Sequence, residues 1–244
     1  MSVAIKVLSA GAVEIMLEQI GPEFETASGE KLAMEFATVG TMRKRLEAGE
    51  QADLVTISES AIRALDTPGF FVPGSIVNLG QSVTGIAVRA GAPKPDVSTV
   101  EAFHKALLAA RRVAYVDPKG GGSSGIYLDG YFRKVGILDA INENAALQKQ
   151  GHGVALAVAS GEADIGMTFI SELLAVPGLT VLGPLPPGIG NANMYTAAIP
   201  AASRQQAKAA AFLKALTDPA RAAAGPRRGW NRPSSARSLH NIIR

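Results

Sequence analysis

Small hydroxyl residues and glycines gather in several turns of the sequence, each placed directly after a short apolar segment. The clearest turn is residues 117–125, DPKGGGSSG, which follows the strand-like RVAYV. It lacks GxxxxGK[ST]. Gly120, Gly122 and Gly125 have the GxGxxG spacing, but that motif alone is a weak signal, so a nucleotide-phosphate loop is not expected. Backbone N–H groups and hydroxyls at the start of a helix suit a carboxylate or an oxyanion instead.

The same combination recurs at SAG (9–11), TVG (38–40), GHG (151–153) and TF (168–169). Each turn also has an ordinary interpretation, because Ser and Thr are common helix caps and glycines are common turn formers. A lone histidine between glycines is more often a surface or capping residue. The recurrence nevertheless predicts an anion site built from Ser9, Ala10, Thr38, Val39, Gly40, Ser123, Ser124, Gly125, Gly151, His152, Thr168 and Phe169.

Strands and helices alternate along the chain and must position these turns. Apolar runs predict strands, at 3–9, 31–37, 53–58, 82–90, 112–116, 145–150 and 163–169, and a Pro/Gly linker that becomes a strand at 184–199. Helical spacing predicts helices, at 12–28, 40–49, 59–65, 99–110, 124–135, 153–161 and 202–224. Such alternation is typical of an α/β protein with mostly parallel sheets and right-handed crossovers.

Crossing segments near 80–84 and 184–194 predict two lobes, each a sheet flanked by helices. Lobe 1 is expected to comprise residues 1–82 and 194–225, and lobe 2 residues 83–193. The remaining residues, 226–244, are expected to form a disordered basic tail. Ligands of open α/β sheets bind beyond the carboxyl ends of the strands, so a cleft between the lobes is expected to hold the ligand.

Composition excludes several classes of protein. Apolar residues make up 47% of the chain and charged residues 18%, as in ordinary globular proteins. The chain has no cysteine, and its three histidines are far apart, so neither a metal site nor a cofactor is predicted. No apolar run is long enough for a membrane helix. The N-terminal MSVAIKVLSAG lacks the pattern of a signal peptide, which predicts a cytoplasmic location, or a periplasmic one if a leader has been removed.

The basic charge is confined to the C-terminal end. Residues 225–244 contain five arginines and no acidic residue, so the formal charge without them is +3 − 5 = −2. The rest of the chain is therefore nearly neutral, and nucleic-acid binding is not expected.

The order of these motifs resembles the periplasmic molybdate-binding protein family, a branch of the type II solute-binding fold. The resemblance rests on LSAGAVEIMLEQIGPEFE, FATVGTMRKRLEAGEQADLVTIS, DPKGGGSSG and GEADIGMTF, and covers residues 3 to about 222. It implies two lobes that clasp a small anion by hinge closure, with an ABC permease as partner. By position, the family's oxyanion contacts correspond to Ser9 or Ala10, Thr38, Val39, Ser123, Ser124, Gly151 and Phe169.

Two positions depart from the family pattern. Val39 and Phe169 stand where the oxyanion binders carry a serine and a tyrosine, so two hydroxyl donors are missing. This favours a small organic carboxylate over molybdate as the ligand. The same fold branch includes an aconitate isomerase, which leaves open an enzyme that catalyses a 1,3-proton shift. In that case His152 is the expected base; for a binding protein no catalytic residue is expected.

Overall fold

The computed structural model describes residues 3–218 and 230–231, which form two compact units. Of these residues, the first unit contains 3–81 and 193–218 with Asn231, and the second contains 82–192 with Trp230. Within the described ranges, no helix is both long and apolar enough to cross a bilayer.

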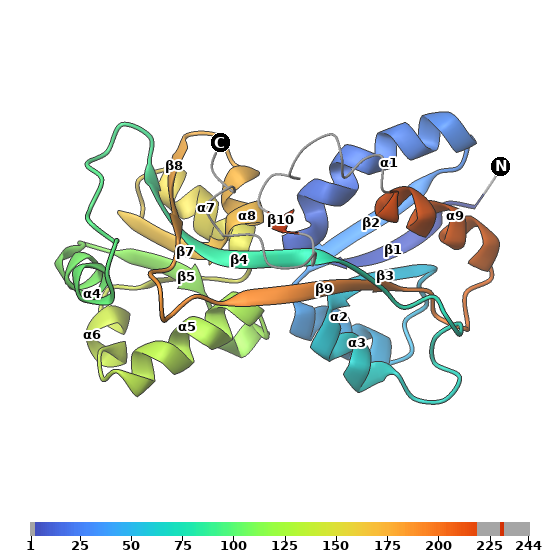
Figure 1. Cartoon of the computed structure of the whole chain (residues 1–244), viewed down its shortest axis with the longest axis horizontal. Helices are drawn as coiled ribbons and strands as arrows, with labels where there is room; N and C mark the ends of the chain where they lie inside the picture. The colour runs from blue at the N-terminus through green and yellow to red at the C-terminus, as the bar shows by residue number, and fades with distance from the viewer. Residues whose placement is uncertain (1–2, 219–229, 232–244) are drawn as a thin grey trace. The chain divides into compact units, whose positions relative to one another are not determined.

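The first unit is built on a sheet with the strand order β2-β1-β3-β9 (Figure 1). Strand β1 (Ile5–Ala10) runs parallel to both β2 (Leu32–Ala37) and β3 (Leu54–Ser58). Strand β9 (Ala192–Ala198) runs antiparallel to β3. The carboxyl ends of the three parallel strands therefore meet at one edge of this sheet.

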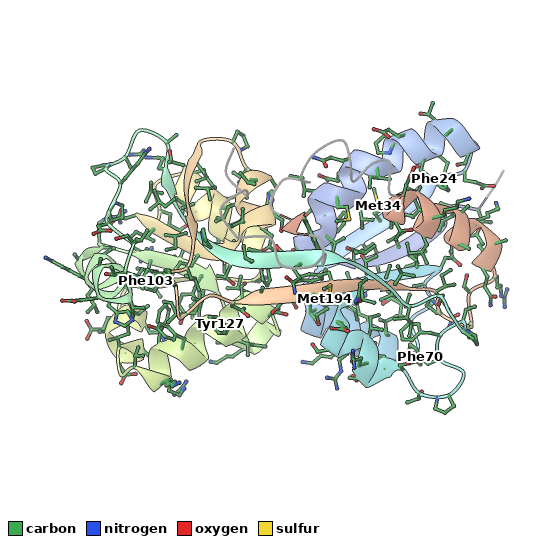
Figure 2. The ribbon with its side chains drawn as sticks, in the orientation of Figure 1. Phe24, Met34, Phe70, Phe103, Tyr127 and Met194 are labelled. Atoms are coloured by element: carbon green, nitrogen blue, oxygen red, sulfur yellow. The ribbon has the colours of Figure 1, made fainter. Side chains whose placement is uncertain are left out.

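Helices cover both faces of the first sheet. The 3₁₀ turn η1 (Gly11–Val13) leads into α1 (Glu14–Ser28), which packs with α9 (Gln206–Thr217) on one face. The rings of Phe24 and Phe212 join these two helices with centroids 4.9 Å apart. Figure 2 labels Phe24 on α1. The opposite face carries α2 (Val39–Glu47) and α3 (Glu59–Leu65).

The second unit has its own mixed sheet, with the strand order β4-β7-β5-β6. Strand β5 (Val113–Val116) runs parallel to β6 (Ala146–Gln148) and to β7 (Ile165–Phe169). Strand β4 (Val77–Arg89) pairs antiparallel with β7 and with β8 (Leu179–Pro184). The carboxyl ends of β5, β6 and β7 again share one edge.

Two groups of helices enclose the second sheet. On one face lie α4 (Val100–Ala109), α5 (Ser123–Lys134) and α6 (Leu138–Asn142), over a core that includes Phe103, Tyr115 and Phe132. On the other lie α7 (Gly151–Ala159) and α8 (Ile170–Leu174). There Val154 and Val158 pack against Ala114 and Val116 of β5.

Several local details differ from the sequence-based expectation. Helix α1 begins at Glu14, after η1, whereas a helix was predicted from residue 12. Helix α4 begins at Val100 and not at residue 99, because the Thr99 hydroxyl caps it by accepting from the N–H of Ala102 at 3.1 Å. Strand β8 and helix α6 were not expected; both are short and lack a clear apolar period.

Most of the C-terminal segment that was expected to be disordered lies outside the described residues. Trp230 and Asn231 are described, and they form the short strand β10, which pairs with β4. The Trp230 side chain is buried, with 4% of its surface exposed. At Trp230 the chain is therefore ordered, because the large indole side chain is removed from water.

Candidate functional site

The carboxyl edge of the first sheet brings together five of the predicted site residues. Ala10 ends β1, and Thr38, Val39 and Gly40 form the start of α2 directly after β2. The strands pair in register, with Ser9 beside Phe36 and Ala10 beside Ala37. Three helical segments, η1–α1, α2 and α3, therefore begin at this edge and direct backbone N–H groups outward from it.

Hydroxyls at the first edge are engaged within the protein. The buried Ser9 hydroxyl donates to the carbonyl of Ala10 at 3.0 Å and accepts from Thr56 at 2.7 Å. Thr38 caps α2 by accepting from the N–H of Thr41 at 3.1 Å. Val39 and Gly40 are half-buried and offer only backbone groups. This edge is therefore a donor surface of main-chain N–H groups more than of side chains.

The loop 117–125 is held by local contacts at the second edge. The Asp117 carboxylate accepts from the N–H of Lys119 at 3.0 Å and caps the 3₁₀ turn η2 (Pro118–Gly120). Gly121 has φ +73°, a left-handed conformation that favours glycine. The loop thus turns tightly and delivers Ser123 and Ser124 to the first turn of α5.

Two predicted glycines lie in close packing contacts. A Cβ on Gly125 would overlap the carbonyl oxygen of Val116, so only glycine lets α5 approach β5 this closely. A Cβ on Gly151, the first residue of α7, would overlap the carboxylate of Glu172. The sequence analysis assigned both glycines to ligand contact, and the structure shows a packing reason for each.

Polar side chains at the second edge form a buried chain. Thr168, which is fully buried, donates its hydroxyl proton to Glu172 Oε2 over 2.5 Å. Ser124, 2% exposed, lies 3.3 Å from the same threonine hydroxyl. The N–H of Phe169 points to the same Glu172 oxygen at 3.4 Å, and the Phe169 ring is buried.

His152 and two lysines are exposed around this edge. His152 is the second residue of α7, and its side chain faces solvent. Lys119 and Lys149 lie in the loops after β5 and β6 and are also exposed. These loops lie side by side, because a Cβ on Gly120 would be 3.8 Å from the Lys149 carbonyl oxygen. The second edge therefore carries exposed positive charge, on Lys119 and Lys149, that was not predicted from the sequence.

Sequence reasoning missed Glu172 and Ser58. Glu172 is 9% exposed, although a buried carboxylate is costly unless it is hydrogen-bonded. Its position three residues after Phe169 is that of a helix-capping glutamate, which was the available signal. Ser58 was recognised only as the cap of α3; it is 5% exposed and ends β3 at the first edge.

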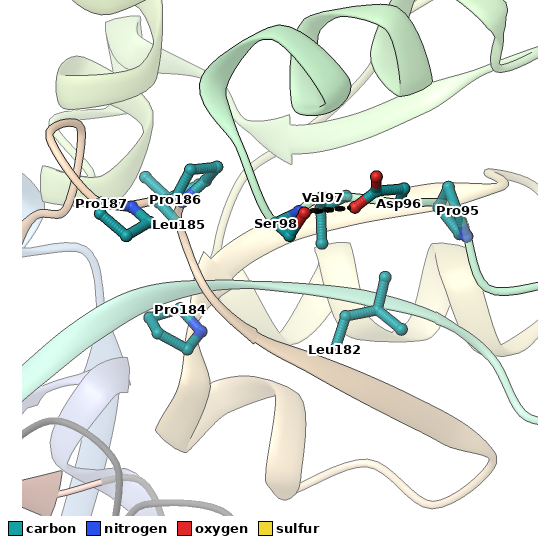
Figure 3. A pocket seen from close by; sticks show the side chains of 9 residues that line it. All are labelled: Pro95, Asp96, Val97, Ser98, Leu182, Pro184, Leu185, Pro186 and Pro187. Atoms are coloured by element: carbon teal, nitrogen blue, oxygen red, sulfur yellow. Dashed lines mark hydrogen bonds between the residues drawn. The ribbon is translucent and has the colours of Figure 1, made fainter.

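A surface pocket of about 330 Å³ lies elsewhere on the second unit (Figure 3). It is lined by residues 95–98 and by Leu182 with residues 184–187. Its carboxylate, Asp96, accepts from the hydroxyl of Ser98 at 2.7 Å and from the Ser98 N–H at 2.9 Å. None of the predicted site residues lines this pocket.

Known proteins resemble the chain over most of its length. It is 35% identical over 217 residues to aconitate isomerase from Pseudomonas sp., covering 87% of this chain and 81% of the relative. It is 25% identical over 184 residues to the molybdate-binding protein ModA of Escherichia coli strain K12, covering 75% and 71%. The periplasmic molybdate-binding protein of Azotobacter vinelandii shares the fold, with a TM-score of 0.71 at 20% identity, over 90% of this chain and 95% of that one.

The α/β architecture and the family resemblance expected from the sequence are thereby confirmed. The structural neighbours are periplasmic binding proteins of type II. The model of the family described as bacterial extracellular solute-binding protein matches residues 5–231, and the chain belongs to this family.

Proposed function

We propose that the protein binds a small organic polycarboxylate in preference to molybdate. The observation that carries this proposal is the similarity to aconitate isomerase, 35% over 87% of the chain, against 25% over 75% for a molybdate-binding protein. An enzyme that acts on an unsaturated tricarboxylic acid must bind that anion. A site inherited from the same ancestor would keep donors suited to carboxylate groups.

The two sheet edges support this ligand class. Main-chain N–H groups at the starts of α2, α5 and α7 stabilise negative charge through the helix dipole. Lys119 and Lys149 add exposed positive charge at the second edge, against the single carboxylate of Asp117 in the same loops. Such charge attracts a polyvalent anion and increases its association rate.

The side chains argue against a tetrahedral oxyanion. Val39 and Phe169 occupy positions where hydroxyl donors are expected in oxyanion binders, and neither side chain can donate. An oxyanion oxygen that is desolvated without a donor costs roughly 1–3 kcal/mol or more. A carboxylic acid has an apolar carbon skeleton, which needs no hydroxyl donor.

A ligand screen tests the proposal. Aconitate, citrate, tricarballylate, molybdate, tungstate and sulfate would be added separately, and the melting temperature measured. A bound polycarboxylate held well above its Kd is expected to stabilise the fold by roughly 2–4 kcal/mol. Stabilisation by molybdate or tungstate alone would overturn the proposal.

Charge variants make this test sharper. Lys119→Gln and Lys149→Gln are expected to weaken polycarboxylate binding in isothermal titration calorimetry, and the loss should shrink at high salt because exposed charges are screened. Lys134→Gln is the matched control, since Lys134 is exposed at the opposite end of α5. If all three variants weakened binding by the same factor, the ligand would not bind preferentially at the second edge.

Hinge closure and a permease belong to the same proposal. A ligand-dependent decrease in the radius of gyration, measured by small-angle X-ray scattering, would support clasping of the ligand. Stimulation of ligand uptake by an ABC permease reconstituted with the protein would support a transport role. Neither result is required if the protein is an enzyme.

The second candidate function is isomerisation of an unsaturated polycarboxylic acid by a 1,3-proton shift. The observation that favours it is again the 35% sequence identity to aconitate isomerase. Binding and isomerisation use one site, so turnover of aconitate by the wild-type protein separates this candidate from a pure binding role.

A further inference from the structure

Glu172 is a buried carboxylate at the second sheet edge that the binding role alone does not require. It lies in the first turn of α8 and is 9% exposed. Its Oε2 atom accepts the hydroxyl of Thr168 at 2.5 Å and faces the N–H of Phe169 at 3.4 Å. These bonds hold the carboxylate in one orientation.

The hydrogen bonds determine which way the hydroxyl protons of Ser124 and Thr168 point. Thr168 has a single hydroxyl proton, and it is donated to Glu172. In the contact of 3.3 Å between Ser124 and Thr168, Ser124 must then be the donor. Both hydroxyl protons therefore point along the chain toward the Glu172 carboxylate. If Glu172 takes up a proton, Glu172 can donate to Thr168 and Thr168 to Ser124. The Ser124 hydroxyl can then donate its own proton to a group outside this chain of hydrogen bonds.

The carboxylate also lies at a predicted ligand position. A methyl group on the Cα of Gly151 would overlap the Glu172 carboxylate, so the two groups are in direct contact. Gly151 begins α7, where a ligand carboxylate was expected. The Glu172 carboxylate therefore lies beside the predicted ligand position at Gly151.

We propose that Glu172, and not His152, is the general base and general acid of this site for an unsaturated polycarboxylate ligand. The inference rests on the proposed function, that such a ligand binds at the second edge. Glu172 takes a proton from the methylene carbon of the ligand, and the C–H electron pair enters a carbanion delocalised over the allylic carbons and their carboxylates. The protonated Glu172 returns the proton to the other end of the allylic system, which shifts the double bond and regenerates the carboxylate.

The described elements around Glu172 carry two titratable side chains. On the elements packed against α8, namely α7, β7, β8 and β4, the titratable side chains are His152 and Arg89. The Arg89 guanidinium lies near Gly161, beyond the opposite end of α7 from Gly151. His152 is exposed, whereas Glu172 is buried and held by hydrogen bonds.

The test uses the full chain with aconitate as the probe. Calorimetry measures binding, and ¹H NMR follows double-bond isomerisation in H₂O and deuterium incorporation into the methylene group in D₂O. In Glu172→Gln the amide oxygen can still accept from Thr168, and a negative charge is removed from the site. Affinity is expected to stay or increase, while isomerisation and exchange fall by roughly 10²–10⁴-fold. A purely structural role would lower both together.

Two further variants serve as comparisons. His152→Ala tests the alternative base: a loss of exchange as large as that of Glu172→Gln would assign the proton transfer to His152. Glu143→Gln changes an exposed glutamate of the same unit and is the control, with no effect expected. If Glu172→Gln does not fold, Thr168→Val replaces it. Loss of the hydroxyl donor should raise the pKa of the base, so the pH midpoint of exchange should shift upward. An unchanged midpoint would overturn the proposal.

The outcomes separate this inference from the proposed function. If wild type binds no polycarboxylate, the proposed function and the inference both fail. If it binds aconitate without exchange or isomerisation, the inference fails and the binding role stands. If Glu172→Gln retains wild-type exchange, or if His152→Ala abolishes it, Glu172 is not the base.

Discussion

The carboxylate of Glu172 lies directly against the Cα of Gly151, so closely that no larger residue fits at position 151 without displacing it. The two residues belong to different helices, α8 and α7, whose N-termini meet at the carboxyl edge of the second sheet. This contact places a buried acid at the position where the sequence predicts a ligand. It connects the packing of the second unit with its proposed chemistry.

Gly151→Ala is the first prediction. The added methyl group must push the Glu172 carboxylate away, which is expected to cost about 1–3 kcal/mol of unfolding free energy and to weaken polycarboxylate binding. Urea denaturation and calorimetry measure the two effects. Gly130→Ala is the matched control, because Gly130 is in α5 and a Cβ there would meet nothing within 4 Å. It should stabilise the helix by roughly 0.5–1 kcal/mol. Equal stability of Gly151→Ala and wild type would contradict the observed contact.

The second prediction concerns molybdate. Wild type is expected to show no sub-micromolar molybdate binding, because Phe169 provides no hydroxyl. Phe169→Tyr adds a donor and is expected to increase molybdate affinity by about 10-fold or more, as a hydrogen bond to a charged group contributes roughly 1.5–3 kcal/mol. Phe70→Tyr, at a half-buried ring in a loop of the first unit, is the control. No gain in Phe169→Tyr would mean that the ring at 169 does not face the anion.

The third prediction is an acid dependence of stability in the first unit. Side-chain hydrogen bonds from Arg45 and Lys6 lower the pKa of Glu50 from 4.5 to about 2. Because the folded-state pKa is the lower one, the stabilisation is present above the ordinary carboxyl range and is lost as pH falls toward about 2. Glu50→Gln should therefore be less stable than wild type at pH 7, and the difference should vanish near pH 2.

Urea unfolding at several pH values measures this difference. Glu18→Gln is the control, because Glu18 is an exposed glutamate on α1 of the same unit. A Glu50→Gln difference that does not change with pH would show that the ion pairs do not stabilise the folded state.

The fourth prediction concerns Trp230. Its burial predicts that Trp230→Ala lowers the unfolding free energy by roughly 3–5 kcal/mol, through lost apolar contact and the cavity left behind. Trp230→Phe keeps part of the apolar volume and should cost less. If Trp230→Ala unfolds at the same urea concentration as wild type, this strand contributes nothing to stability and the segment is dispensable.

The sequence by itself determined the elements whose signals are local. The helix Glu59–Leu65 was predicted with the bounds that the structure has, because apolar spacing acts within a few residues. The alternation of strands and helices is also a local signal, and it predicted the two sheet edges. Family motifs at 36–58 and 161–169 then indicated the type II fold.

Only the tertiary structure decided which groups meet. Ser124 and Thr168 are 44 residues apart in sequence, and their contact depends on α5 packing beside β7. From the sequence alone, Glu172 has the position of a helix-capping residue, and only the structure shows that it contacts the start of α7. Trp230 lies in a polar C-terminal stretch of the sequence, and only the structure shows that its strand β10 pairs with β4. Contacts between distant segments follow from the total packing of the unit, since no local propensity encodes them. The strand ends in the sequence were thus enough to predict an anion site. The buried carboxylate of Glu172 beside those residues could be recognised only in the folded chain.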